Sequence, residues 1–539
     1  MIPGTEISRS DIPFRPEPAA EPGRIAPVFP LAVIELGTSA IRMAIGESDG
    51  VSDVRVLEQL VRGVSLGKDS FTTGEIQRKT LTEVVRVLKS YRRKLREYQC
   101  EDPKRIRVVA TSAVREAANR LEVIDRIYIA TNFAVELIDD AEIARVTYLG
   151  VRPLLQTDAQ LSEATTVVAE VGGGNTEVLM LNGRDIVHSQ PYRLGSLRLM
   201  QQVEQSQATR SRAGSLMLGQ IDRIFEPLIE LVPPGRPVAF VALGGDMRFA
   251  ARLLGLDPEK AELTRVPVAD LEKLTTKFQA LTVDRIMHRY HIELSQAETL
   301  VPALLANLRM AQRLNVSELL ITRFNLRDAL LQSMLRTNDW SADFCDQVLS
   351  SATELARKYE VDLAHTRHVA DLARRLFRAL QARHRLDVRC ETLLTAAALL
   401  HTTGLFVGLS AYHKHSYYLI MNSELFGLNA EDHRLVALLA RYHRRASPKP
   451  THDVFAQLSR DSRVLVSLLA AILRVAVALD QSSTQRIREF ETSIEKNRLI
   501  ITVTGNVGDL SLERMELRQK ASLMEDTFGL SVLLRESQR

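Results

Sequence analysis

The sequence predicts an α/β fold in its N-terminal part, followed by an all-helical domain and a small α+β appendage. Between residues 31 and 325, short β-rich runs such as LAVIELG, IRVVATSA and TVVAEVGGG alternate with helical stretches such as residues 74–98. This alternation is typical of α/β folds. After residue 340, apolar residues recur at helical spacing with few strand signals. The chain of 539 residues is too long for one core, so several domains are expected.

Changes in pattern divide the chain into five segments. Residues 1–30 hold seven prolines and no apolar periodicity, which predicts a disordered leader. Two α/β subdomains are expected at residues 31–151 and 152–337, the helical domain at 338–488 and the appendage at 489–539. We expect helices at 351–380, 391–400, 432–441 and 464–479, and in the appendage a strand at 499–503, a helix at 512–528 and a strand at 530–534.

Composition is that of an ordinary globular protein, with 45% apolar and 25% charged residues. The net charge of +4 is small for this length, so nucleic acid is not expected as a partner. Basic runs at residues 89–96 and 441–445 fit solvated helix faces, and contact with a polyanion stays open as an alternative. We find neither a signal peptide nor a run of about 18 uncharged apolar residues, and we expect a cytoplasmic protein without membrane contact.

Two segments 135 positions apart share one design, in which an apolar strand, a carboxylate and a loop of small residues lead into a second strand. Glycine lets consecutive backbone N–H groups turn toward one point, where they can receive phosphate oxygens. A carboxylate before each loop could hold Mg²⁺ through water beside the phosphates. The first segment contains Glu35, Gly37, Thr38 and Ser39, and the second contains Glu170, Gly172, Gly173, Gly174, Asn175, Thr176 and Glu177.

This duplication predicts phosphate binding, with ordinary hairpin turns as the alternative. Hydroxyl or amide groups of Thr38, Ser39, Asn175 and Thr176 can add donors to each loop. A third strand and glycine loop at residues 240–246 completes the set. The three cysteines are scattered and lack the spacing of a zinc or disulfide framework.

Six motifs follow one another along the chain: ELGTSA, VVATSAVREAANR, IDDAEIARVTYLGV, EVGGGNTE, RLGSLRL and ALGGDMRFAARL. Their order is similar to that of the exopolyphosphatase and guanosine pentaphosphate phosphatase family, from residue 31 almost to the C-terminus. The resemblance implies two subdomains of the actin, sugar-kinase and heat-shock ATPase fold, which is ribonuclease H-like. It also implies a hydrolase that removes terminal phosphate from polyphosphate or guanosine pentaphosphate by Mg²⁺-assisted, in-line attack of water.

The resemblance also implies roles for individual residues. Glu142, in IDDAEIAR, matches the base that holds the attacking water. Glu177 matches a carboxylate that helps to orient water or metal. Arg115 and Arg198 match arginines that grip phosphate, a task that suits the planar guanidinium fork.

Several positions depart from the family pattern. The family usually has aspartate before each loop, whereas Glu35 and Glu170 are one methylene longer. Asn175 stands where serine is common, and Ile143 replaces the second of two adjacent acids. These changes keep a second interpretation open: a non-enzymatic sensor that binds polyphosphate or an alarmone and regulates a partner. No motif supports a kinase.

The helical part resembles the metal-dependent phosphohydrolase domains named for a histidine–aspartate (HD) pair. Their metal ligands would map onto His365, His401, Thr402 and Asp480. Because Thr402 replaces the paired aspartate, no catalytic metal is expected here. We expect the domain to extend a polyanion surface or to form the contact of a homodimer. Three other histidines either satisfy a polar interior or bind phosphate when protonated: His413, His415 and His443.

Overall fold

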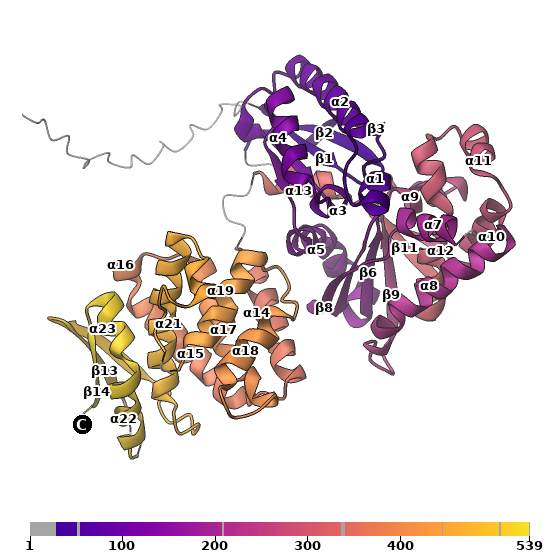
Figure 1. Ribbon diagram of the computed structural model, residues 1–539. Coiled ribbons are helices and arrows are strands. Elements are labelled where there is room, and N and C mark those ends of the chain that lie inside the picture. Colours follow the sequence, from indigo (N-terminus) through magenta and orange to yellow (C-terminus); the bar gives the residue numbers. More distant parts are fainter. Residues whose placement is uncertain are drawn as a thin grey trace, which may run out of the picture.

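The computed structural model describes residues 28–50, 54–206, 210–335, 340–444, 446–505 and 508–537. It places two sheets with their helices in the N-terminal part, and a helical region with a small sheet at its far end in the C-terminal part (Figure 1). The leader expected at residues 1–30 lies almost entirely outside the described residues. Its last two residues, Phe29 and Pro30, already belong to the first strand.

The first sheet has five strands in the order β3-β2-β1-β4-β5. β1 is buried from Leu31 onward, because it pairs antiparallel with β2 on one side and parallel with β4 on the other. The elements of this subdomain are β1 (Phe29–Leu36), β2 (Ala40–Ser48), β3 (Arg55–Gly63), α1 (Leu66–Thr73), α2 (Arg78–Glu97), β4 (Ile106–Ala110), α3 (Ser112–Arg115), α4 (Arg120–Thr131), β5 (Val135–Leu137) and α5 (Asp140–Thr157).

The second sheet repeats this plan with six strands in the order β10-β11-β9-β6-β7-β8. Here β6 takes the place of β1, since it pairs antiparallel with β7 and parallel with β9. The elements are α6 (Ala159–Glu163), β6 (Thr165–Val171), β7 (Thr176–Asn182), β8 (Asp185–Tyr192), α7 (Ser196–Gln205), α8 (Arg210–Glu230), β9 (Val238–Leu243), α9 (Gly245–Leu253), β10 (Leu263–Pro267), α10 (Val268–Gln279), α11 (Val283–Tyr290), α12 (Leu294–Arg313) and β11 (Glu318–Thr322).

The chain returns to the first sheet after β11. Helix α13 (Leu326–Ser333) packs against β1, β2 and α5. Its Leu330 and Leu331 are fully buried with Val33 and Ala44 of the first sheet. The first subdomain is therefore completed by residues almost 300 positions after its first strand, which brings Arg327 to the end of β1.

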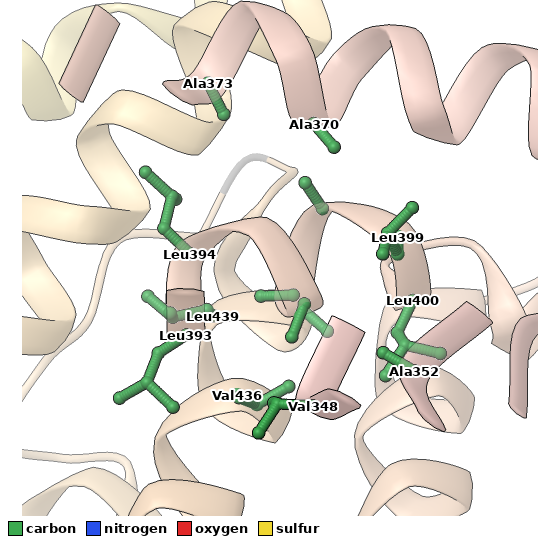
Figure 2. Close-up of a cluster of buried hydrophobic side chains, with 14 of the residues drawn as sticks. Val348, Ala352, Ala370, Ala373, Leu393, Leu394, Leu399, Leu400, Val436 and Leu439 are labelled. Carbon is green, nitrogen blue, oxygen red and sulfur yellow. The ribbon is translucent and has the colours of Figure 1, made fainter. Parts of the chain in front are cut away.

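The helical region forms one large core, of which Figure 2 shows a part between residues such as Val348, Leu394 and Leu439. The single helix expected at residues 351–380 is wrong. The first helix ends at Lys358, and Glu360 then has a left-handed φ of 52°. Asp362 caps a new helix by accepting the N–H groups of Ala364 and His365. The helices are α14 (Ala342–Lys358), α15 (Leu363–Ala379), α16 (Gln381–His384), α17 (Val388–Leu400), α18 (Tyr412–Met421), α19 (Ala430–Tyr442), α20 (Asp453–Ala456) and α21 (Arg460–Leu479).

Helix α21 is unusually apolar. Among the described residues it alone is long and apolar enough to cross a membrane, with a mean hydropathy of 2.0 over 18 residues. The helix is not an uncharged run, because Arg463 and Arg474 lie within it. Because 72% of this window is buried inside the protein, α21 has the character of a core helix.

The C-terminal appendage shares its core with the helical region through Leu499, Ile501 and Leu523. Its sheet has the order β12-β13-β14, and the sequence analysis missed β12. The helix expected at 512–528 is two helices, because the first ends at Lys520 and the second begins at Ser522. The elements are β12 (Phe490–Glu495), β13 (Arg498–Val503), α22 (Ser511–Lys520), α23 (Ser522–Phe528) and β14 (Ser531–Glu536).

The helical region docks on β8 of the second subdomain through α14, and on α5 through the loop between α18 and α19. The backbone N–H of Ile186, in β8, donates to Oε1 of Gln347 at 3.0 Å. The ring of Phe426 packs edge-on against Tyr148 of α5, with ring centroids 5.6 Å apart. These buried contacts place the helical region next to the end of α5.

Candidate active site

Strand register decides which side chains meet at the two glycine loops. In the first hairpin, β1 and β2 place Glu35 directly opposite Arg42. In the second hairpin, β6 and β7 place Glu170 directly opposite Glu177. Directly opposite residues point to the same face of a sheet. One hairpin therefore carries an ion pair, and the other carries two carboxylates.

The two glycine loops lie against each other. A Cβ added to Gly173 would lie 2.8 Å from the Thr38 side chain, closer than such atoms can approach. The second loop is also tightly supported by α7, since a Cβ on Gly195 would lie 2.3 Å from the Gly173 carbonyl oxygen. Close approach, rather than an unusual backbone angle, is what requires glycine at these positions.

In the two loops, the backbone N–H groups and the backbone carbonyl groups differ in their hydrogen bonding. The N–H groups of Thr38, Ser39, Gly173 and Gly174 have no hydrogen-bond acceptor within the part of the chain that the structure describes. By contrast, the Thr38 carbonyl accepts from the Gly67 N–H at 2.8 Å, and the Gly173 carbonyl accepts from the Leu197 N–H at 3.0 Å. Adjacent free N–H groups on facing loops form a nest for anionic oxygens.

The second hairpin holds carboxylates that resist ionisation. Burial raises the pKa of Glu170, and the negative charge of Glu35 raises it further. Burial also raises the pKa of Glu177 well above its usual value, with the charge of Asp140 as the next cause. Both side chains keep some contact with solvent. Only the ionised form of such a carboxyl group can accept a proton, and its affinity for that proton increases with its pKa.

The first hairpin holds its carboxylate ionised. Oε1 of Glu35 lies 3.4 Å from Nη1 of Arg42, and Oε2 lies 2.6 Å from Nη1 of Arg327. Burial alone would raise the pKa of Glu35, but these two guanidinium groups outweigh burial and lower it. Both carboxylate oxygens of Glu35 are therefore engaged by arginine.

The third glycine loop contributes Asp246 at the start of α9. Gly244 has a φ of 104° and packs against the Glu170 side chain, with its Cβ position 3.8 Å from Cγ. Burial raises the pKa of Asp246 to about 6. Arg248, on the same helix, acts electrostatically on both Glu170 and Asp246. The loop thus adds one acid and one cation beside the second hairpin.

The start of α5 separates two acids that the sequence places close together. Asp140 is ion-paired with Arg115 and acts electrostatically on Glu177. Glu142 lies two residues on, and residues two apart point to different sides of a helix. Its Oε1 lies 2.8 Å from Nη2 of Arg107 and 3.5 Å from Nη2 of Arg145. The structure therefore brings Asp140 to Glu177, and holds Glu142 in a separate ion-pair cluster.

The two arginines expected to grip phosphate border the second loop. Arg198 donates from Nε to the Gly174 carbonyl at 2.6 Å, and its guanidinium lies 3.8 Å above the Phe71 ring. Arg115 donates to the Ile138 carbonyl at 2.7 Å. Thr176, at the end of the loop, uses its hydroxyl within the protein, donating to the Leu194 carbonyl.

The remaining loop residue, Asn175, carries an orphan acceptor. Its side-chain Oδ1 is buried and has no hydrogen-bond partner among the described residues. Burying a polar atom without a partner costs folding free energy, unless a ligand forms a hydrogen bond with it or an ion is coordinated by it. This atom adds an oxygen to the carboxylates of the second hairpin.

The histidines of the helical region gather in a second place. Nδ1 of His365 lies 2.7 Å from Oδ2 of Asp480, and the rings of His365 and His401 are 5.6 Å apart. The ring of His443 lies 4.9 Å from that of His401. In the described part of the chain, no group of three or more histidine, cysteine, aspartate or glutamate side chains could hold a metal ion.

Sequence reasoning did not assign roles to Arg42, Arg248, Arg327 and Asp140. Arg42 could have been found from spacing, because it follows Glu35 by seven residues, just as Glu177 follows Glu170. Two residues seven apart across a short hairpin loop face each other when the strands pair antiparallel. Arg327 gave no such signal, since it reaches Glu35 from 292 positions away.

Two family models match the chain. One, for the Ppx/GppA phosphatase family, matches residues 44–338. The other, for domain III of Ppx/GppA phosphatases, matches residues 349–521. Together the matches span the second sheet, the first sheet from the middle of β2 onward, most of the helical region, and the appendage through α22. β1 and the first glycine loop lie before the first matched residue.

Two curated relatives are named guanosine-5'-triphosphate,3'-diphosphate pyrophosphatase. That of Photobacterium profundum is 22% identical over 95% of this chain and 99% of its own length. That of Aeromonas salmonicida is 25% identical over 90% of this chain and 95% of its own length. A solved exopolyphosphatase from Cytophaga hutchinsonii covers 57% of this chain and 97% of its own, with 22% identity and a TM-score of 0.50. The predicted α/β fold with a helical C-terminal region is confirmed.

Proposed function

The chain belongs to the Ppx/GppA phosphatase family, and we propose that it hydrolyses the terminal phosphoanhydride bond of guanosine pentaphosphate or of inorganic polyphosphate. The observation that supports this most is the nest of four free N–H groups on the facing loops, beside two carboxylates of raised pKa. The relatives named guanosine-5'-triphosphate,3'-diphosphate pyrophosphatase match along almost the whole chain, which favours the nucleotide as substrate.

In the proposed reaction, the terminal phosphate lies on the N–H groups of Gly173 and Gly174. Water attacks its phosphorus in line with the bridging oxygen. The new oxygen–phosphorus bond forms as the bridging bond breaks, and the remaining phosphate chain leaves with the electron pair. The carboxylate of Glu177 takes the proton of the water. Arg115 and Arg198, which border the loop, are proposed to stabilise the charge on the phosphate oxygens.

Glu142 stays the family-based prediction for the base, and the contacts favour Glu177 over it. Glu142 is held by Arg107 and Arg145, whereas Glu177 faces Glu170 at the loop. A base must reach the water that it activates. Parallel assays of Glu142→Gln and Glu177→Gln distinguish the two assignments.

The oxygens of the second hairpin fit Mg²⁺, and those of the first do not. Glu170 and the orphan Oδ1 of Asn175 are hard oxygen ligands of the kind that Mg²⁺ takes. Glu35 has both oxygens engaged by guanidinium groups. We therefore propose that Glu170 holds Mg²⁺ through water, while Arg42 and Arg327 supply positive charge at the first loop. When bound, Mg²⁺ would neutralise phosphate charge.

The test is release of orthophosphate by the purified full chain, with guanosine pentaphosphate and long-chain polyphosphate compared at equal concentrations of phosphate ends. We expect Mg²⁺-dependent release, faster from guanosine pentaphosphate. If orthophosphate were released at the same rate with and without Mg²⁺, the metal would have no part in the reaction. Absence of release from both substrates over several divalent cations would remove the hydrolytic function.

The engagement of Glu35 by two arginines also favours a second candidate, a regulatory protein that binds the same anions without turnover. An arginine-neutralised loop can bind phosphate as well as a catalytic one can. Binding of guanosine pentaphosphate in a dialysis experiment, with no orthophosphate released over hours, would select this candidate.

A further inference from the structure

The helical region and the appendage enclose a cavity of about 800 Å³. Its walls come from the start of α15, the segment after α17, the end of α21 and α22, and none of its lining residues belongs to the glycine loops. A volume of this size accommodates a small organic ligand. The cavity plays no part in the reaction proposed above.

Aromatic rings form one wall of this cavity. Tyr359 and Phe406 both line it and pack edge to face, with centroids 5.6 Å apart. Phe406 keeps 56% of its surface exposed, an unusual state for a phenylalanine. Tyr412 adds a third ring to the lining and packs 5.3 Å from the ring of His443. Such flat, partly exposed rings suit stacking against a planar base.

His401 supplies a hydrogen-bond acceptor. Its Nδ1 lies 2.7 Å from the Ala398 carbonyl, which can only accept, so Nδ1 carries the proton. The ring of His401 is fully buried, which favours its neutral form and makes Nε2 an acceptor. His401 lines the cavity, so Nε2 can accept from a hydroxyl or amino group of a ligand. His365 also lines the cavity, and its Nδ1 is engaged by Oδ2 of Asp480 at 2.7 Å.

The charged residues of the cavity differ in how strongly they are engaged. Lys520 is held by Glu516 at 3.2 Å and by Gln481 at 2.6 Å. Asp362 is occupied in capping α15. Arg444 has no acidic partner in the described part of the chain, and its guanidinium lies 4.9 Å above the Tyr412 ring. Arg444 is therefore the cation best placed to meet an anionic group.

The combination of rings, a neutral histidine acceptor and an arginine without an acidic partner among the described residues matches a specific ligand class. We propose that this cavity binds a phosphorylated nucleoside, as a second ligand site separate from the glycine loops. The base stacks on the exposed ring of Phe406, a ribose hydroxyl donates to Nε2 of His401, and a phosphate meets Arg444. Because Thr402 stands beside His401 and supplies no anionic metal ligand, the site binds its ligand without hydrolysing it.

The experiment is isothermal titration calorimetry with GDP on the full chain, in the presence of a chelator to suppress turnover. The titration is carried out in the Gly173→Val variant, whose added side chain would collide with Thr38. This collision disrupts the site at the glycine loops, so that only binding at the cavity remains. In that background we expect one equivalent of GDP to bind. Thr402→Trp, which fills the cavity, and Arg444→Gln should each lower the affinity at least tenfold. Thr402→Trp in the native background should leave orthophosphate release at the glycine loops unchanged.

Two further probes identify the part of the ligand that is recognised. Guanosine should bind more weakly than GDP because it lacks the phosphate that meets Arg444, and pyrophosphate should bind more weakly because it cannot stack. Loss of all GDP binding in Gly173→Val would overturn the proposal, and so would an affinity that Arg444→Gln leaves unchanged. If pyrophosphate binds as tightly as GDP and guanosine does not bind, the cavity is a site for bare phosphate.

Discussion

Residues directly opposite each other across a hairpin set the chemistry of this site. The same glycine-loop design occurs twice, yet Glu35 faces Arg42 and Glu170 faces Glu177. The two hairpins differ in the charge of the residue opposite the glutamate. Arginine at that position forms an ion pair and lowers the pKa of Glu35, whereas Glu170 and Glu177 are two acids whose pKa values are raised. The proposed reaction assigns different roles to the two hairpins: the first adds positive charge beside the phosphate, and the second binds the terminal phosphate, holds the metal and activates water.

Glutamine variants of the two loop carboxylates separate these roles. Glu170→Gln removes a charge from the proposed metal position, so the Mg²⁺ concentration for half-maximal activity should rise at least tenfold. Glu35→Gln leaves Arg42 and Arg327 without their buried partner, so it should lower the melting temperature and change the Mg²⁺ requirement little. Phosphate release over a Mg²⁺ series and thermal unfolding measure both effects. An equal rise in the Mg²⁺ requirement for the two variants would contradict this division.

A carboxylate from the helical region acts on the same acids. Glu424 lies in the loop that docks through Phe426, is exposed to solvent, and interacts electrostatically with Asp140 and Glu177. Its surroundings raise its pKa to about 7, with burial as the main cause and Asp140 as the second. Glu424 therefore changes charge within the physiological pH range.

The KM for a polyanionic substrate should follow this titration. As pH rises from 6 to 8, Glu424 loses its proton and adds negative charge beside Glu177, so KM should increase several-fold. In Glu424→Gln this increase should be smaller, with little change in kcat at pH 6. Initial rates at pH 6, 7 and 8 give both constants. The same pH profile in wild type and variant would show that Glu424 does not face the substrate.

At the scale of elements, helix α7 supports the second glycine loop from behind. Gly195 caps α7, and the N–H groups of its first turn bond the Gly172 and Gly173 carbonyls. This contact leaves the loop N–H groups facing outward. The position of α7 thus fixes the phosphate nest.

Gly195→Ala tests this support. Its Cβ would lie 2.3 Å from the Gly173 oxygen, so the loop must shift. A displacement near 1 Å at a reacting site can cost about 100-fold in rate, and we expect a loss of roughly ten- to 100-fold in kcat/KM. The matched control is Gly219→Ala in α8, where the added methyl has open space and should stabilise the helix by up to about 1 kcal/mol. Unchanged activity in Gly195→Ala would separate α7 from the site.

Local patterns predicted most of these elements, and long-range contacts explain the failures. The paired loops were visible from Glu35 and Glu170 because strand, carboxylate and glycines are consecutive. The break at Glu360 was not visible in the sequence. A left-handed glutamate depends on the packing of α14 and α15, and it leaves the spacing of apolar residues almost intact. Arg327 and Glu424 reach the site only through tertiary folding, which no local pattern records.

At the scale of the whole molecule, a partly buried histidine of the second subdomain lies within electrostatic reach of the helical region. His188, in β8, has its Nε2 3.1 Å from the Tyr192 hydroxyl. Burial lowers the pKa of His188 to about 4, and the charge of Lys358 in α14 adds to the shift. The imidazole is therefore neutral where β8 meets α14.

This histidine should make stability depend on pH. The unfolded chain binds a proton at His188 below about pH 6.5, and the folded chain does so only below about pH 4. Stability is therefore lost as pH falls through this window, by roughly 1–2 kcal/mol at pH 5. His188→Gln should show a smaller fall in melting temperature between pH 7 and pH 5 than the wild type. The exposed His288 supplies a control variant, His288→Gln, and equal falls in all three proteins would contradict the assignment.

Turnover by Glu177→Gln decides whether the second hairpin activates water. Orthophosphate release from guanosine pentaphosphate is measured beside equilibrium binding of the same substrate, with Glu142→Gln as the paired variant. We predict that Glu177→Gln loses at least 100-fold in kcat and binds within about threefold of wild type, while Glu142→Gln loses less. Full activity in Glu177→Gln, with loss confined to Glu142→Gln, would contradict the proposed site and return the base to α5.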